Sequence, residues 1–190
     1  MNRNLKTVAL AILVVVLVSL IYTKFFRGLV LVRSNVDGRE YLVRNMPDKQ
    51  DASDRLASLC KKLNEFIDVL GQEYPNDSRI KRIQENFVCH TVHEGDGFLD
   101  TTSYTTDKEH ITLCLRNEND YALHSENVLM FVFIHEIAHV GNHSYGHDEN
   151  WRKFFVFLLE EAEARGYYQY HDFEQMPVEY CGMMVQQNIN

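Results

Sequence analysis

The sequence predicts an α+β domain that follows one N-terminal transmembrane helix. Three observations support this prediction: an uncharged apolar segment near the N-terminus, stretches where apolar and polar residues alternate, and stretches where apolar residues recur at helical spacing. Alternation is typical of strands, and recurrence every three to four residues is typical of helices. Because helical stretches outnumber alternating ones, we expect residues 28–190 to form one domain in which several helices pack against a small sheet.

The apolar segment from Thr7 to Thr23 contains no charged residue. A helix needs about 20 apolar residues, and at least about 17, to cross the hydrocarbon core of a bilayer. We therefore expect residues 1–27 to be an N-terminal transmembrane anchor with short flanks, and the protein to be a single-pass membrane protein. The alternatives are an apolar core segment and a cleavable signal peptide, for which the segment offers no A-x-A cleavage site.

The charge distribution separates residues 1–27 from the remainder of the chain. Residues 1–27 carry four basic and no acidic side chains, so removing them from the net charge of −8 leaves −12 for residues 28–190. Nucleic-acid binding depends largely on Lys and Arg side chains that neutralise phosphates. We therefore expect no general nucleic-acid binding by the domain.

The four cysteines are scattered, and none of them forms a C-x-x-C pair. Their spacing therefore predicts no cysteine zinc site. Two disulfides in an oxidising compartment and four free thiols both fit the count. We favour free thiols, because Cys60 and Cys114 lie in apolar patterns where a small hydrophobic residue is expected.

Strands are predicted at three places. Apolar and polar residues alternate on both sides of Asp37-Gly38, a pair that supplies the positive φ angles of a tight hairpin turn. Alternation over residues 103–116 predicts a further strand. The tail, residues 173–185, can add a short strand.

Helices are predicted at four places. Apolar residues recur at helical spacing over residues 53–72 and, in a shorter run, over residues 76–87. Residues 125–141 are apolar nearly all round, which is typical of a buried helix. The last helix is expected from Asp148 to Arg165 and is stopped by the following glycine.

The buried helix contains the motif H-E-x-x-H. His135 and His139 are four residues apart, so their imidazoles project from one helix face, one turn apart, where they can bind one metal ion. Glu136 lies next to that metal, where it can take a proton from water without being a ligand. This arrangement is typical of zinc peptidases, in which zinc lowers the pKa of its water to about 7.

A purely structural role fits these three residues poorly. In an otherwise apolar helix, two core imidazoles and a carboxylate would each need a buried partner, and an unpaired buried charge is costly. One metal ion satisfies all three groups together. The motif therefore predicts a zinc site.

A catalytic zinc site needs a third protein ligand and an open position. We favour His147, because it precedes Asp148, a good N-cap, and so begins a helix that must fold back onto the buried helix. His143 is an alternative, although Gly141 interrupts the helical spacing before it. The remaining alternatives are glutamates of the last helix, namely Glu160, Glu161 and Glu163.

The segment HEIAHVGNHSYGHDENW resembles the active-site segment of WLM-type metallopeptidases, relatives of the SprT-like zincins. Their pattern is H-E-[LI]-A-H, a short loop, and then H-D-x-x-[FW] at the start of a helix. By this resemblance, His135, His139 and His147 match the three metal ligands. Glu136 matches the general base, and Trp151 matches the aromatic residue that packs the second helix.

The wider run from about Asp51 to Cys181 is similar to predicted membrane-anchored metallopeptidases of large DNA viruses. This resemblance implies a small zincin-like domain with a mixed sheet, and a location in a viral or host membrane. In zincins a peptide substrate binds along a sheet edge, and the predicted strand over residues 103–116 is our candidate for that edge.

The sequence thus predicts a membrane-anchored zinc endopeptidase that acts on protein or peptide substrates. Zinc is the expected cofactor, and a tyrosine is expected to stabilise the oxyanion; the candidates are Tyr104, Tyr145 and Tyr180. One alternative is a gluzincin-type membrane peptidase with Glu160 or Glu161 as the third ligand. The other is a non-catalytic, zinc-stabilised membrane adaptor module, which would not need Glu136.

Overall fold

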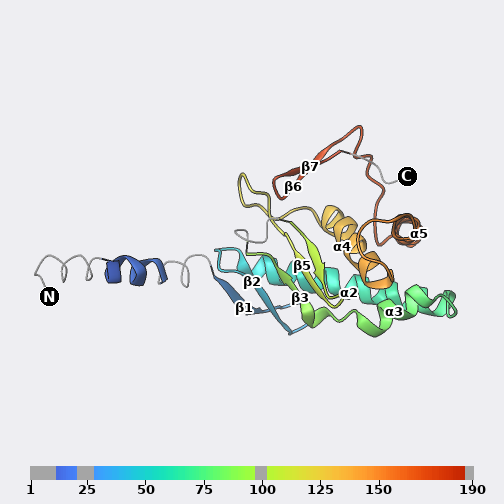
Figure 1. The fold of residues 1–190 in the computed structure, drawn as a ribbon, viewed down its shortest axis with the longest axis horizontal. Coiled ribbons are helices and arrows are strands. Elements are labelled where there is room, and N and C mark those ends of the chain that lie inside the picture. The colour runs from blue at the N-terminus through green and yellow to red at the C-terminus, as the bar shows by residue number, and fades with distance from the viewer. Residues whose placement is uncertain (1–11, 21–27, 97–101, 187–190) are drawn as a thin grey trace, which may run out of the picture.

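The computed structural model describes residues 12–20, 28–96 and 102–186. Within these residues the architecture is α+β: four helices from α2 to α5 pack with two two-stranded sheets and one three-stranded sheet (Figure 1). Buried apolar residues between Tyr41 and Cys181 form one hydrophobic core.

The predicted transmembrane helix, Thr7–Thr23, is wrong. Residues 12–20 are helical, and the rest of that prediction, residues 7–11 and 21–23, lies outside the described residues. No helix in the described ranges combines the length and apolar character needed to cross a membrane. The prediction of a single-pass membrane protein is therefore wrong as well.

Strands β1 (Leu29–Arg33) and β2 (Glu40–Arg44) form an antiparallel hairpin that confirms the prediction around Asp37-Gly38. Gly38 has a φ of 73°, the left-handed conformation that glycine adopts without steric cost. Two side chains of β2, Tyr41 and Val43, are buried and belong to the core. The hairpin therefore covers one flank of the long helix that follows.

Helix α2 (Lys49–Glu73) begins four residues before the predicted start and buries one apolar face. Helix α3 (Ser78–Asn86) is the predicted shorter helix, and the Asp77 side chain caps it by accepting a hydrogen bond from the Arg79 amide at 2.8 Å. The two helices contact each other, and both contact the central helix described below.

The three-stranded sheet is mixed. It has the order β3-β5-β4, in which β3 (Val92–Glu94) runs parallel and β4 (Tyr104–Thr106) antiparallel to β5 (His110–Leu113). A 3₁₀ turn, η1 (Cys89–Thr91), leads into β3. Strands β3 and β4 are thus the two edge strands of this sheet among the described strands.

The single strand predicted over residues 103–116 is wrong, because the segment is a hairpin. The chain reverses at Asp107 and Lys108, which have φ angles of 52° and 61°. Two consecutive residues with positive φ make the tight turn that suits the twist of an antiparallel pair. The alternation of apolar and polar residues did not reveal this turn, since neither residue is a glycine.

Helix α4 (Glu126–Gly141) is the central helix, and twelve of its 16 residues are buried. Ser125 caps it through a hydrogen bond from the Val128 amide. It contacts α2, α3, β4 and β5, and also α5 (Glu149–Ala164). Its apolar surface is therefore covered by helices and by the edge strand, as predicted for a buried helix.

The last residue of α4 allows close packing of the helices. A Cβ atom added to Gly141 would lie 2.5 Å from the Phe154 ring of α5 and 3.1 Å from the Arg79 carbonyl oxygen. A larger residue would therefore push α5 away from α4. This close approach brings the start of α5 back to the end of α4.

The C-terminal hairpin consists of β6 (Val178–Tyr180) and β7 (Met183–Val185). In Figure 1 it lies on the side of α4 and α5, away from the β1–β2 hairpin. A disulfide joins Cys181, in the turn of this hairpin, to Cys114, which follows β5. Free thiols were therefore the wrong prediction for this pair, because only the tertiary fold brings together two cysteines that are 67 residues apart.

Cys60 and Cys89 are free, as predicted, and both are buried. Cys89 accepts a hydrogen bond from the Asn64 amide group at 3.3 Å. The hydrogen bond with Cys89, followed by burial, raises the pKa of the Cys60 thiol. The Cys60 thiol is therefore a protonated packing residue near neutral pH.

Removing the disulfide is expected to destabilise the domain by about 4 kcal/mol, because a cross-link that closes a loop of this length restricts the unfolded chain by about that amount. Denaturant unfolding of Cys114→Ala/Cys181→Ala beside the wild type measures the effect. A reducing agent should lower the wild-type stability to that of the variant and leave the variant unchanged. Equal stability of the oxidised wild type and the variant would contradict the prediction.

Candidate metal centre

Three histidine side chains converge at the end of α4. The Nε2 atoms of His135 and His139, one helical turn apart, are 3.3 Å from each other. The Nε2 atom of His147, in the loop before α5, is 3.1 Å from each of them. The structure thus brings together the three residues that the sequence predicted as metal ligands.

The spacing of these nitrogen atoms fits one zinc ion. Zinc binds imidazole nitrogens at about 2.0–2.1 Å in tetrahedral geometry, which separates two ligand nitrogens by about 3.3 Å. The observed separations of 3.1–3.3 Å agree with this value. Among the described residues three ligand atoms converge, which is the number of protein ligands that catalytic zinc sites use.

The protonation states of the histidines favour metal binding. Burial, followed by the neighbouring histidines, lowers the pKa of His135 to about 3. Burial, followed by His147 and Lys108, lowers the pKa of His139 to about 4. Both imidazoles are therefore neutral near pH 7. A neutral imidazole has one nitrogen lone pair to offer, which is the form that binds zinc.

The loop between α4 and α5, residues 142–148, is pinned by hydrogen bonds and holds His147 in place. Lys108, in the β4–β5 turn, donates hydrogen bonds to the backbone carbonyls of Asn142 and Ser144, the latter at 2.9 Å. Ser144 in turn donates to the Asp148 carboxylate, which also caps α5 by accepting from the Trp151 amide at 2.8 Å. The loop is therefore fixed to the sheet at one end and to the helix at the other.

Trp151 forms one wall of the site. Its buried indole stacks on the His139 ring, with the ring centroids 4.9 Å apart, and meets the His147 ring edge-on at 4.3 Å. The His135 ring also contacts it, at 4.7 Å. The aromatic residue that we expected to pack the last helix thus packs the metal ligands as well.

Glu136 lies beside the histidines with a fixed carboxylate. The Thr105 hydroxyl of edge strand β4 donates a hydrogen bond to Oε2 of Glu136 at 2.7 Å. Burial raises the pKa of Glu136 to about 7, although this hydrogen bond opposes the shift. A carboxyl group with a pKa near neutrality can both accept and return a proton, as general acid–base catalysis requires.

A cavity of about 260 Å³ opens onto these groups. His135, Glu136, His139 and His147 all line it, together with residues of the strand and the loop that face them: Ser103, Tyr104, Thr105, Lys108, Ser144, Tyr145 and Gly146. Two of the three tyrosines expected to stabilise the oxyanion, Tyr104 and Tyr145, therefore border the cavity. Tyr180 is buried instead.

The alternative third ligands lie outside this cluster. His143 is exposed and does not belong to the group of converging ligand atoms. Glu160 lines a separate surface cavity with Arg152, and Glu161 forms an ion pair with Arg165 at 2.7 Å. Glu163 borders another cavity, near Tyr167. Among the described residues, the converging group on α4 is completed by His147.

A second group of potential metal ligands consists of Cys114, His124 and Cys181. All three are buried, and the Cys181 sulfur lies 3.7 Å from Nε2 of His124. Zinc binds cysteine as the thiolate. Since the disulfide joins both sulfur atoms, no thiolate is available in the oxidised chain, and the three histidines are the better metal centre.

Sequence reasoning missed three residues that shape the site, namely Ser103, Thr105 and Lys108. Their sequence neighbourhood was assigned to a substrate-binding strand, but nothing in the alternation distinguishes them from other polar residues. Thr105 reaches Glu136 only because β4 contacts α4, and Lys108 reaches the ligand loop only because the chain turns there.

Comparison with known proteins finds similar viral proteins, which are described as uncharacterized. Over 187 residues, 96% of this chain and 95% of the relative, the chain is 30% identical to the uncharacterized protein R325 of Acanthamoeba polyphaga mimivirus. It is 44% identical over 69 residues to the uncharacterized protein 042R of Invertebrate iridescent virus 3, covering 36% of this chain and 43% of that protein. No family model and no solved structure matches the chain.

Proposed function

We propose that this chain, which belongs to the family of the uncharacterized mimivirus protein R325, is a zinc-dependent endopeptidase. The observation that carries the proposal is the convergence of three Nε2 atoms, 3.1–3.3 Å apart, beside a buried carboxylate in one cavity. His135, His139 and His147 would hold the zinc ion. Glu136 would be the general base.

Zinc at this site would supply Lewis-acid chemistry, which makes water acidic near neutral pH and polarises a carbonyl oxygen. Glu136 accepts the proton of the water that attacks the peptide carbonyl and then donates it to the departing amine nitrogen. The Thr105 hydrogen bond holds the carboxylate toward the cavity during both transfers. Trp151 and the pinned loop keep the histidine rings in their orientation.

A peptide is the substrate that best fits the surroundings of the site. Edge strand β4 has one neighbour, β5, in the described sheet, so its other edge can pair with an extended peptide. Tyr104 and Thr105 of this strand line the same cavity as Glu136. A peptide added to β4 would therefore pass its backbone across the metal centre.

Two features argue against a zinc module without catalysis. Glu136 is buried and is not needed to complete the ligand set, so a structural module would gain nothing from it. Structural zinc sites are also usually closed by four protein ligands, whereas the part of the chain that the structure describes supplies three converging ligands.

The test is digestion of a diverse peptide library by the full chain. Zinc-loaded protein is expected to cleave a subset of peptides, and removal of the metal by a chelator should abolish cleavage. Adding back one equivalent of zinc should restore it. Mass spectrometry identifies the products, and elemental analysis gives the zinc content. Fully zinc-loaded protein that cleaves no peptide in the library would rule out the proposed function.

A further inference from the structure

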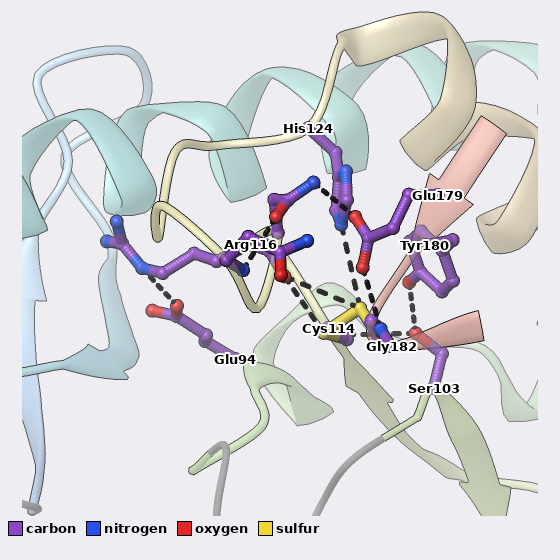
Figure 2. Close-up of a disulfide and its surroundings, with 11 residues drawn as sticks. Glu94, Ser103, Cys114, Arg116, His124, Glu179, Tyr180 and Gly182 are labelled. Atoms are coloured by element: carbon purple, nitrogen blue, oxygen red, sulfur yellow. Dashed lines mark hydrogen bonds and ion pairs between the residues drawn. A yellow bond between two sulfur atoms is a disulfide. The ribbon is translucent and has the colours of Figure 1, made fainter. Parts of the chain in front are cut away.

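The hydroxyl groups of Ser103 and Tyr180 form a pair beside the disulfide (Figure 2). Their oxygen atoms are 2.5 Å apart, and the Cys114 amide donates a hydrogen bond to the same Ser103 oxygen at 2.9 Å. Ser103 immediately precedes β4 and lines the cavity that contains Glu136 and the three histidines.

We propose that Ser103 donates a hydrogen bond to the carbonyl oxygen of the scissile peptide as it gains negative charge, and that Tyr180 and the Cys114 amide orient the Ser103 hydroxyl for this role. This inference rests on the proposed peptidase function. It assigns the oxyanion donor to a serine rather than to one of the three tyrosines considered from the sequence.

The direction of the hydrogen bonds follows from burial. Tyr180 is only 3% exposed, so its hydroxyl hydrogen must find an acceptor within the protein. Burial also raises the pKa of Tyr180, so the phenol keeps this hydrogen. The Ser103 oxygen is its hydrogen-bond partner. Tyr180 is therefore the donor and Ser103 the acceptor of their hydrogen bond.

The number of hydrogen bonds that the Ser103 hydroxyl can accept determines where its own hydrogen atom points. A hydroxyl oxygen accepts two hydrogen bonds and donates one. The Tyr180 hydroxyl and the Cys114 amide fill both acceptor positions of Ser103. The remaining capacity is the Ser103 hydrogen, and the open side of this residue is the cavity. Ser103 is thus prepared to donate, and not to accept, at the metal centre.

The disulfide helps to hold this arrangement. Tyr180 precedes Cys181 and Ser103 contacts the Cys114 backbone, so both partners lie next to the half-cystines (Figure 2). A donor that is already oriented stabilises a developing oxyanion without reorganisation, and loss of one such donor costs about 10²–10³-fold in kcat.

The test compares Ser103→Ala with the wild type in the zinc-loaded full chain. We expect kcat to fall about 10²–10³-fold while KM changes little. A phosphinic peptide with the sequence of the best substrate mimics the tetrahedral oxyanion, and calorimetry should show a comparable loss of affinity. Zinc content and unfolding temperature should not change. Ser103→Thr keeps the hydroxyl and should retain most of the activity.

Two further variants test the role of Tyr180. Tyr180→Phe removes the hydrogen bond that orients Ser103, so kcat should fall about fivefold to tenfold, the equivalent of one hydrogen bond. The double variant should be no worse than Ser103→Ala, because both changes act through the same hydroxyl. Ser53→Ala, which removes a buried hydroxyl bonded to the Val32 carbonyl, and Tyr168→Phe are matched controls that should keep wild-type kcat.

Each outcome separates this inference from the proposed function. If the wild type cleaves peptides and Ser103→Ala has the same kcat and the same affinity for the phosphinic peptide, Ser103 is not the oxyanion donor, although the peptidase function stands. An increase of KM alone would assign Ser103 to substrate binding and overturn the inference. If Ser103→Ala does not fold, Tyr180→Phe carries the test. A kcat lowered about fivefold to tenfold, with a comparable loss of affinity for the phosphinic peptide, supports the inference. Wild-type kcat and affinity in Tyr180→Phe overturn it. A wild type that cleaves nothing removes both proposals.

Discussion

Replacing Glu136 by glutamine is expected to remove nearly all peptide cleavage while zinc binding stays intact. Glutamine has almost the same shape and can still accept the Thr105 hydrogen bond, but its amide cannot accept the proton of the attacking water. General acid–base catalysis contributes about 10²–10⁴-fold, so kcat should fall by that factor. Elemental analysis for zinc and cleavage of a fluorogenic peptide are measured on the same protein sample.

A matched control lies on the same helix. Glu126, in the first turn of α4, forms an ion pair with Lys62 at the surface, far along the helix from the histidines. Glu126→Gln should therefore keep both zinc and cleavage. Should Glu136→Gln cleave peptides as fast as the wild type, Glu136 is not the general base. Should it lose zinc, its role is to support the ligands instead.

Replacing His147 by alanine is expected to weaken zinc binding as strongly as replacing His139. Each substitution removes one of three converging nitrogen atoms, and two imidazoles hold zinc poorly. Mutation of a residue that only supports a zinc ligand lowers the zinc affinity about 10–100-fold. Loss of a ligand itself should therefore lower the zinc affinity more than about 100-fold. Competition with a zinc indicator measures the dissociation constant.

His143→Ala is the matched control, because His143 belongs to the same loop but is exposed outside the cluster. Glu160→Ala tests the gluzincin arrangement. Both variants should bind zinc as the wild type does. Normal zinc binding by His147→Ala together with loss of zinc by Glu160→Ala would replace the three-histidine centre with a gluzincin-type centre.

The local elements of the fold could be read from the sequence, because helices and tight hairpins depend on residues near one another in the chain. The spacing of apolar residues predicted α2, α3, α4 and α5 to within a few residues. Ser125 and Asp148 are the observed helix caps. Asp37-Gly38 marked the first hairpin correctly.

The errors concern features whose sequence signal has more than one meaning. An apolar run of minimal length fits a membrane span and a short helix equally, and the described part contains only residues 12–20 as a helix. Alternation over residues 103–116 fits one long strand or two paired strands. Only the φ angles at Asp107 and Lys108 decide for the hairpin.

The sequence by itself determined the pairing of His135 with His139 and the position of Glu136 between them, because a helix places residues four apart on one face. The tertiary structure alone decided the rest of the site. It brought His147 to 3.1 Å from both histidines, Thr105 to the Glu136 carboxylate, and Cys181 to Cys114. These contacts join different helices, strands and loops, and their geometry depends on how the elements pack, which no spacing along the chain encodes.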